Sequence, residues 1–267
     1  MKQRCFFLET IAVWAPFSAG DAVVLSLEKP YAVIGRTPTP ERWSMTIYER
    51  ALAFVHDGDA VGLGSGHAST EFITELGQRV RAGLNVRGVA TSRASEELAR
   101  HAGIPIISLA EGMPLALTVD GADEVDPHLN LIKGYGRALV REKIVAAASR
   151  QLIILIGPGK EVPVLGSRGK LPIEVVPFAV PLCQDRLIKL GCNPILYKEN
   201  GVPFVTDNGN YILDCLIAPI LHPEQFEEHL RAIPGIVGTG LFLGMADRVL
   251  VGDEHFNLVA EKQRTIP

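Results

Sequence analysis

Short apolar runs alternate with longer amphipathic segments between residues 46 and 156, and this alternation constrains the fold more than any other feature of the sequence. Each apolar run has the length of a buried strand, and each amphipathic segment repeats its apolar residues at helical spacing. Strands that alternate with helices indicate a parallel sheet covered by helices on both faces. We predict strands at 60–63, 86–90, 104–108, 115–119 and 152–156, and helices at 46–56, 69–81, 92–102 and 137–148.

The pattern changes near residue 171, where predicted strands follow one another with fewer helices between them. Their order indicates a small α+β unit with an antiparallel sheet. Asn208-Gly209 is a typical hairpin turn, so we expect the strands on its two sides to pair. The predicted elements are strands at 173–176, 195–198, 202–206 and 211–218, helices at 181–190 and 223–232, and later strands at 240–243 and 248–251.

These patterns divide the chain into three parts. Residues 45–168 and 239–267 are predicted to form one α/β domain, and residues 169–238 an α+β domain inserted into it. Residues 1–44 are predicted to be an extension, disordered or not native, because prolines between residues 30 and 40 suggest a linker. The 267 residues, 47% of them hydrophobic, suffice for the cores of one or two domains.

Charge and hydropathy argue against nucleic-acid and membrane partners. The 26 basic and 30 acidic residues give a net charge of −4 without clusters of Lys and Arg, so we expect no nucleic-acid-binding surface. No apolar run reaches the ~18 to 20 residues of a membrane helix. The four cysteines form no Cys-x-x-Cys pair, and such sparse usage predicts a cytoplasmic protein.

Several predicted strands are followed by residues suited to bind a ligand. Gly64, Asp120 and Gly157 each come just after a strand, and ligands of parallel sheets bind beyond the carboxyl ends of the strands. The run Gly62-Leu-Gly-Ser-Gly66 stands before a helix, where backbone N–H groups bind phosphate; a plain tight turn is an equally good interpretation. The neighbouring His67 could contact a phosphate or sugar oxygen, or only cap or pack the helix.

The run Asp120-Gly-Ala-Asp123 brings two carboxylates close together. Such carboxylates raise one another's pKa, which suits proton exchange with hydroxyl groups. A simple turn also uses Asp and Gly, and a divalent metal is a third interpretation because aspartate clusters hold Mg²⁺.

Lys133 and Glu142 add a base and a further acid to this region. Lys133 is either functional or a solvated loop lysine. Glu142 lies in the predicted helix 137–148 between Arg141 and Lys143, and such a charged trio is common on helix surfaces. Apolar residues around the trio indicate that part of this face is buried, and a buried glutamate with cationic neighbours is a suitable general base.

Together these blocks resemble the ribose-5-phosphate isomerase type A family over residues 45–251, most strongly at 120–127, 131–134 and 141–146. The resemblance implies interconversion of D-ribose 5-phosphate and D-ribulose 5-phosphate through a cis-enediol, without a metal or organic cofactor. It implies a Rossmann-like three-layer parallel sheet domain with an inserted ferredoxin-like α+β domain. It also implies a homo-oligomer, either a dimer or a tetramer.

The resemblance assigns roles to individual residues. Glu142 matches the glutamate that moves the proton, and Lys133 would stabilise the enediolate oxygen. Asp120 or Asp123 would relay hydroxyl protons. The residues matched to substrate binding are Ser65, Gly66, His67, Ala68, Gly121, Ala122, Gly134, Tyr135, Gly136 and Lys160.

The chain departs from the family pattern around the ligand. The usual Gly-Thr-Gly-Ser-Thr loop reads Gly-Ser-Gly-His-Ala at 64–68, and Tyr135 and Arg137 interrupt a lysine loop that is usually glycine after glycine. Gly157 replaces a usual aspartate. These departures bear on the substrate more than on the reaction type, so an isomerase of another phosphorylated sugar and a non-catalytic sugar-phosphate-binding protein stay as alternatives. We also hypothesise that Arg137 and His67 supply charge for the phosphate.

Overall fold

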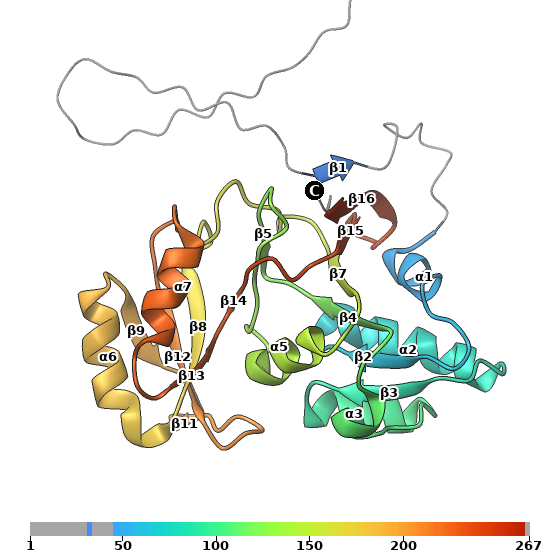
Figure 1. Ribbon diagram of the computed structural model, residues 1–267, viewed down its shortest axis with the longest axis horizontal. Helices are drawn as coiled ribbons and strands as arrows, with labels where there is room; N and C mark the ends of the chain where they lie inside the picture. The colour runs from blue at the N-terminus through green and yellow to red at the C-terminus, as the bar shows by residue number, and fades with distance from the viewer. Residues whose placement is uncertain (1–30, 34–44, 265–267) are drawn as a thin grey trace, which may run out of the picture.

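The computed structural model describes residues 31–33 and 45–264 (Figure 1). A seven-stranded sheet and a four-stranded sheet lie side by side in this part of the chain, with helix α5 (Leu139–Ala147) between them. Most of the predicted extension over residues 1–44 lies outside the described residues, but Tyr31–Val33 forms strand β1 at the edge of the larger sheet.

The larger sheet confirms the predicted α/β architecture. Within the described residues its order is β1-β16-β15-β7-β4-β2-β3. The strands from β15 to β3 run parallel, β16 pairs antiparallel with β15, and β1 pairs antiparallel with β16. The strands are β1 (Tyr31–Val33), β2 (Ala60–Leu63), β3 (Arg87–Ala90), β4 (Leu117–Gly121), β7 (Leu152–Ile156), β15 (Arg248–Gly252) and β16 (Leu258–Arg264).

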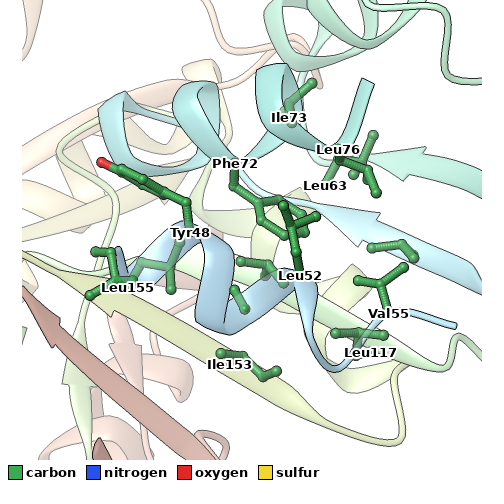
Figure 2. Packing of buried hydrophobic residues seen from close by; sticks show 14 of the residues in the cluster. Tyr48, Leu52, Val55, Leu63, Phe72, Ile73, Leu76, Leu117, Ile153 and Leu155 are labelled. Carbon is green, nitrogen blue, oxygen red and sulfur yellow. The ribbon is translucent and has the colours of Figure 1, made fainter. Parts of the chain in front are cut away.

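Helices cover both faces of this sheet, as continuous apolar strands require. On one face, Phe72 and Leu76 of α2 pack with Leu63 of β2 in the cluster of Figure 2. Fully burying each of these side chains stabilises the fold by about 1.5–3 kcal/mol. On the other face, Val145 of α5 approaches β2 so closely that a Cβ at Gly62 would lie 2.7 Å from it.

Local sequence signals set the starts of several helices. Thr46 and Glu49 form a capping box at α1, and the Ser92 side chain accepts a hydrogen bond from the Ser95 N–H at α3. Each helix in the described part of the chain is too short or too polar to cross a membrane. The helices on the larger sheet, besides α5, are α1 (Ile47–Leu52), α2 (His67–Arg81), α3 (Arg93–His101) and α4 (Leu109–Gly112).

The smaller sheet has the order β13-β8-β12-β9, with antiparallel pairing throughout. Its elements follow one another as strand-helix-strand-strand-helix-strand, which is the ferredoxin-like arrangement. Leu187 of α6 and Leu230 of α7 are buried in one cluster with Leu213 of the sheet. The elements are β8 (Lys170–Val175), a 3-10 turn η1 (Pro177–Ala179), α6 (Val180–Lys189), β9 (Asn193–Leu196), β12 (Tyr211–Leu216), α7 (Pro223–Arg231) and β13 (Ile236–Thr239).

Two small sheets complete the described fold. One of them, with the order β14-β6-β5, places Lys133 directly after β6, where its N–H donates to the Gly240 carbonyl at 2.9 Å. A Cβ at Gly240 would lie 2.4 Å from the Lys133 carbonyl oxygen, so only glycine fits this crossing. The short strands are β5 (Glu124–Val125), β6 (Leu131–Ile132), β10 (Lys198–Glu199), β11 (Val202–Pro203) and β14 (Leu241–Phe242).

The predicted strand at 104–108 is wrong. This segment touches β3 through a single bridge between Gly88 and Ile106. Pro105 has no N–H to donate to a ladder, so regular pairing cannot extend across it.

The predicted hairpin at Asn208-Gly209 is also wrong. β11 pairs with β10 across Asn200-Gly201, whereas β12 pairs with β8 and β9. The reason is the buried carboxylate of Glu174, whose Oε1 accepts hydrogen bonds from the side chains of Thr206 (3.0 Å) and Asn210 (2.8 Å). These bonds close residues 206–210 into a compact loop instead of a ladder.

Candidate active site

Three buried charged side chains from separate elements meet where α5 approaches the carboxyl end of β4. Asp120 belongs to β4, Lys133 follows β6, and Glu142 lies in the first turn of α5. The three side chains are 1–3% exposed. Charged groups are rarely this buried unless they are paired or functional.

Asp120 is fixed by donors on both carboxylate oxygens. Its Oδ1 accepts hydrogen bonds from Ser65 N (3.1 Å), Gly121 N (2.8 Å) and Ser69 Oγ (3.1 Å). Its Oδ2 lies 2.9 Å from Lys133 Nζ. An ammonium therefore stands where the metal interpretation of the aspartates would put a cation, and the interpretation as a simple turn does not account for the burial of Asp120.

Lys133 lies between two carboxylates. Its Nζ is 2.9 Å from Asp120 Oδ2 and 3.2 Å from Glu142 Oε2, and it donates to the Gly121 carbonyl at 2.6 Å. Burial alone lowers the pKa of Lys133, but Asp120 and Glu142 together raise the pKa above its ordinary value. Lys133 is thus a buried cation at neutral pH, and its interpretation as a solvated loop lysine is wrong.

Glu142 differs from Asp120 because its Oε2 has only the Lys133 ammonium beside it, whereas Asp120 accepts several hydrogen bonds. Among the described residues, Glu142 Oε2 has no hydrogen-bond partner, although Lys133 Nζ is only 3.2 Å away. Burial raises the pKa of Glu142 to about 8; Lys133 opposes this rise and Asp120 adds to it. A carboxyl group that titrates near neutrality can both take and return a proton. The prediction of a partly buried helix face is confirmed, and the surface-trio interpretation is wrong for Glu142.

The glycine loop leads into the N-terminus of α2. Gly64 leaves room for the buried acid, because a Cβ there would lie 2.2 Å from Asp120 Oδ1. Gly66 is the N-cap residue with φ +90°, which favours glycine, and no described side chain caps the helix there. The exposed N–H groups that follow, from His67 onward, and the helix dipole suit an anion.

Asp123 and Lys160 lie at the rim of the site. Asp123 Oδ2 accepts a hydrogen bond from Tyr135 N at 3.0 Å, and its Oδ1 is 3.8 Å from Lys160 Nζ. The Lys160 side chain is 29% exposed, so its ammonium can reach an anionic ligand. Asp123 therefore ties the lysine loop to the end of β4 and lies near a partly exposed cation.

A cavity of about 260 Å³ adjoins the glycine loop. The hydroxyl of Ser65 contacts those of Thr91 at 2.7 Å and Ser92 at 2.9 Å, and the inserted domain contributes Phe204 to the lining. Sequence reasoning does not place Ser92 or Phe204 here. A serine at a helix start is ordinarily a cap, and Phe204 is distant in the sequence.

Arg137 and His67, the two residues of the charge hypothesis, both have partners within the protein, and Arg137 also lines the cavity beside the glycine loop. The guanidinium of Arg137 binds both carboxylate oxygens of Asp214, at 2.6 and 3.0 Å, and lies 3.6 Å from the centre of the Tyr197 ring. Its charge is already neutralised, so the hypothesis that Arg137 serves the phosphate loses support. The exposed His67 side chain belongs to the first residue of α2, and its ring packs beside Phe256 with the ring centres 5.6 Å apart.

The fold and the site define an α/β protein with a ferredoxin-like insert, a buried cluster of two carboxylates and an ammonium, and a glycine loop at the start of α2. A family model described as Ribose 5-phosphate isomerase A (phosphoriboisomerase A) matches residues 87–255. The chain is 47% identical over 206 residues to ribose-5-phosphate isomerase A of Roseiflexus castenholzii, covering 76% of this chain and 88% of that protein. The corresponding protein of Gloeobacter violaceus is 47% identical over 210 residues, with 78% and 91% covered. The chain therefore belongs to the ribose-5-phosphate isomerase A family.

Solved structures show the same fold. The ribose 5-phosphate isomerase A of Methanocaldococcus jannaschii superimposes with a TM-score of 0.77 at 33% identity, over 82% of this chain and 97% of that one. A D-ribose-5-phosphate isomerase in complex with phospho-erythronic acid also has a TM-score of 0.77, at 36% identity, with 82% and 96% covered. The similarity thus spans both sheets.

Proposed function

We propose that this protein interconverts D-ribose 5-phosphate and D-ribulose 5-phosphate by proton transfer through a cis-enediol. The observation that carries the proposal is the buried contact of Asp120, Lys133 and Glu142, in which Glu142 Oε2 faces the Lys133 ammonium at 3.2 Å and accepts no other hydrogen bond among the described residues. Aldose–ketose exchange needs one base that moves a proton between adjacent carbons and a cation that stabilises charge on oxygen. This cluster offers both, and the names of the relatives support the substrate.

In the proposed reaction, Glu142 removes the proton from C2 of the open-chain aldose. The electrons of that bond form the C1–C2 double bond, and the Lys133 ammonium stabilises the negative charge on the C1 oxygen. Asp120 exchanges protons between the hydroxyl groups. Glu142 then returns its proton to C1 while the C2 oxygen becomes the carbonyl, so the ketose forms without gain or loss of atoms.

The substrate is proposed to lie between the α2 N-terminus and this cluster. Its phosphate binds the free N–H groups at the helix start, and Lys160 adds a cation at the rim. A relative that holds phospho-erythronic acid accommodates a phosphorylated acid on the same fold. The proposed substrate-contacting residues are Ser65, Gly66, His67, Ala68, Gly121, Ala122, Gly134, Tyr135, Gly136 and Lys160.

The test is a coupled assay of the purified protein with ribose 5-phosphate in D₂O. We expect turnover, incorporation of deuterium at C1 or C2, and an unchanged rate in EDTA. Binding of ribose 5-phosphate without exchange would instead indicate a non-catalytic binding protein. A large loss in EDTA would restore the metal interpretation of the aspartates.

An isomerase of another phosphorylated sugar is the second candidate. The observation that favours it is the altered loop at 64–68, where His67 and Ala68 lack the hydroxyls usual in the family. A panel of pentose and tetrose phosphates, ranked by kcat/KM, decides between the two substrates.

The raised pKa of Glu142 predicts a pH dependence. Because the free carboxyl titrates at about 8, it is mostly protonated and inactive below that pH. We expect kcat/KM to rise roughly tenfold per pH unit between pH 6 and 8 and then to level off, since kcat/KM reports the free enzyme's base. The substrate phosphate titrates near pH 6, at the lower edge of this range, so the slope between pH 7 and 8 is the part that reports Glu142. A profile that is flat from pH 6 to 9 would contradict the assignment.

We also propose a cytoplasmic homo-oligomer, a dimer in the simplest case. Large apolar side chains lie exposed on the inserted domain, among them Phe178 at 95% and Leu221 at 71%, which supports a subunit contact there. The three described cysteines are free and buried, which fits a reducing compartment. Light scattering of the purified protein should give a mass above that of one chain; a monomeric mass would refute this part.

A further inference from the structure

One turn of the chain connects the proposed cation to the proposed base. Residues 134–137 follow Lys133 and lead directly into α5, which carries Glu142. The turn is closed by a hydrogen bond from Arg137 N to the Gly134 carbonyl at 3.0 Å. The conformation of this turn therefore sets the position of both groups.

The start of α5 is not fixed in the usual way. Its N-cap residue is Ala138, and no side chain among the described residues accepts a hydrogen bond from the first turn. Arg137 just before it has φ +69°, a conformation that a residue with a long side chain rarely adopts. Such a conformation persists only where the surroundings hold it.

Side chains of the turn stabilise this conformation by binding residues of the four-stranded sheet. Arg137 forms its bidentate pair with Asp214 of β12 and stacks on Tyr197. The Tyr135 hydroxyl donates to the Lys170 carbonyl of β8 at 3.2 Å, and the Lys170 ammonium lies 3.8 Å from the centre of the Tyr135 ring.

The Lys170 ammonium is also 3.9 Å from Asp214 Oδ2. The contacts of Arg137 and those of Tyr135 therefore meet at Asp214 and Lys170, and together they connect the turn to the sheet. Arg137 and Asp214 are only 11% and 15% exposed. A bidentate pair shielded in this way is stronger and more directional than a surface ion pair.

We propose that Tyr135 and Arg137 are positioning residues, which fasten the turn to the inserted domain and thereby hold Lys133 against Glu142. This inference rests on the proposed function and deepens it. In this proposal the side chains of the two residues that interrupt the family's glycine-rich loop act on the loop that carries the chemistry, through the contacts of Arg137 with Asp214 and of Tyr135 with Lys170.

The decisive variants are Arg137→Gly and Asp214→Asn. Glycine adopts φ +69° without strain, so Arg137→Gly removes the side chain and leaves the backbone conformation accessible. Asp214→Asn keeps the shape of the partner and removes its charge. We expect each to lower kcat for ribose 5-phosphate about tenfold with KM within about twofold, since small misplacements of catalytic groups are costly. The double variant should lose no more kcat than the more impaired of the two single variants, because both changes break the same anchor.

Two further readouts separate positioning from general destabilisation. If Lys133 moves away from Glu142, the rising limb of kcat/KM should shift to higher pH, because Lys133 opposes the rise in the Glu142 pKa. Amide hydrogen exchange of residues 134–142 should speed up in both variants. Amide hydrogen exchange does not depend on turnover. If the wild type is inactive, the proposed function is refuted, and the exchange of residues 134–142 still tests whether the side chains anchor the turn.

The matched control is Arg50→Ala. Arg50 also binds a carboxylate through two contacts, to Glu261 at 2.8 and 3.2 Å, and also stacks on a ring, that of Phe54 at 4.5 Å. It belongs to α1, away from the turn. We expect Arg50→Ala to leave three quantities unchanged: kcat, the pH dependence of kcat/KM, and amide hydrogen exchange of residues 134–142. The inference would be overturned if Arg137→Gly and Asp214→Asn fold and keep the wild-type kcat, pH dependence and amide exchange. It would also be overturned if Arg50→Ala changed these quantities as much as they do. If Arg137→Gly does not fold, Asp214→Asn alone decides.

Discussion

Glu142→Gln is expected to lower kcat by roughly 10²- to 10⁴-fold, the usual contribution of a positioned general base. Glutamine has nearly the same shape but cannot accept a proton from carbon. The side chain is buried and its Oε2 faces Lys133 at 3.2 Å; a glutamine oxygen can still accept from that ammonium, and Asp120 stays to balance its charge. Binding of ribose 5-phosphate, measured by calorimetry, should stay within a few-fold of wild type.

The folding stability of this variant has a predictable sign. The folded-state pKa of Glu142 is raised, so the folded protein binds a proton more readily than the unfolded chain. That stabilisation is present at low pH and is lost as pH rises from the unfolded pKa near 4.5 through about 8. Glu142→Gln lacks this loss, so its stability relative to wild type should improve between pH 5 and 8 in urea titrations.

Glu174→Gln is the matched control for this experiment. Glu174 is equally buried and also has one oxygen, Oε2, without a partner among the described residues. It lies in β8 of the inserted domain, where its other oxygen binds the loop 206–210. The control should retain kcat within about threefold. Turnover that survives Glu142→Gln and fails in Glu174→Gln would show that we have chosen the wrong carboxylate.

Lys133→Met is expected to impair both catalysis and folding. Removing a donor that stabilises charge on oxygen lowers kcat by about 10²- to 10³-fold. Removing one partner of a buried ion pair costs about 3–5 kcal/mol of stability, because the charge left behind is uncompensated. Here the carboxylates of Asp120 and Glu142 would be left, 2.9 and 3.2 Å from the vacated ammonium position.

The stability loss of Lys133→Met should itself depend on pH. Protonation neutralises the carboxylates, so the difference from wild type should be larger at pH 8 than at pH 5. Thermal or urea unfolding at both pH values measures it.

Lys143→Met serves as the control for Lys133→Met. Lys143 lies near the same ring, 4.9 Å from the centre of Phe242 against 5.4 Å for Lys133, and is 3.6 Å from Glu227. Its side chain is 20% exposed, so we expect a smaller stability loss and no comparable loss of kcat. If Lys133→Met folds and turns over like wild type, the ammonium does not stabilise the intermediate and the mechanism fails.

The sequence predicted long elements better than short ones. The run at 152–156 was apolar enough to fix both ends of β7, and the helix predicted over 137–148 corresponds to α5 at 139–147. A strand of two residues such as β6 has no periodicity to detect. It is held by pairing with β5 on one side and, on the other, with β14 more than a hundred residues away.

The candidate site divides in the same way. Chemical type and spacing along the chain made Asp120, Lys133 and Glu142 candidates for proton transfer, because these properties are local; other interpretations stayed open, and the family resemblance assigned the roles. Their burial, the 2.9 and 3.2 Å contacts around one ammonium and the raised pKa of Glu142 arise only when β4, β6 and α5 converge.

Tertiary structure also decided where Arg137 points. From its position in the lysine loop, a free cation for the phosphate was a reasonable hypothesis, but Asp214 is far away in the sequence and binds it in the fold. The sequence by itself determined which groups this protein carries and the layered fold that presents them. Only the folded chain decided which charges meet and which are neutralised, because electrostatic interactions depend on distance and desolvation rather than on order along the chain.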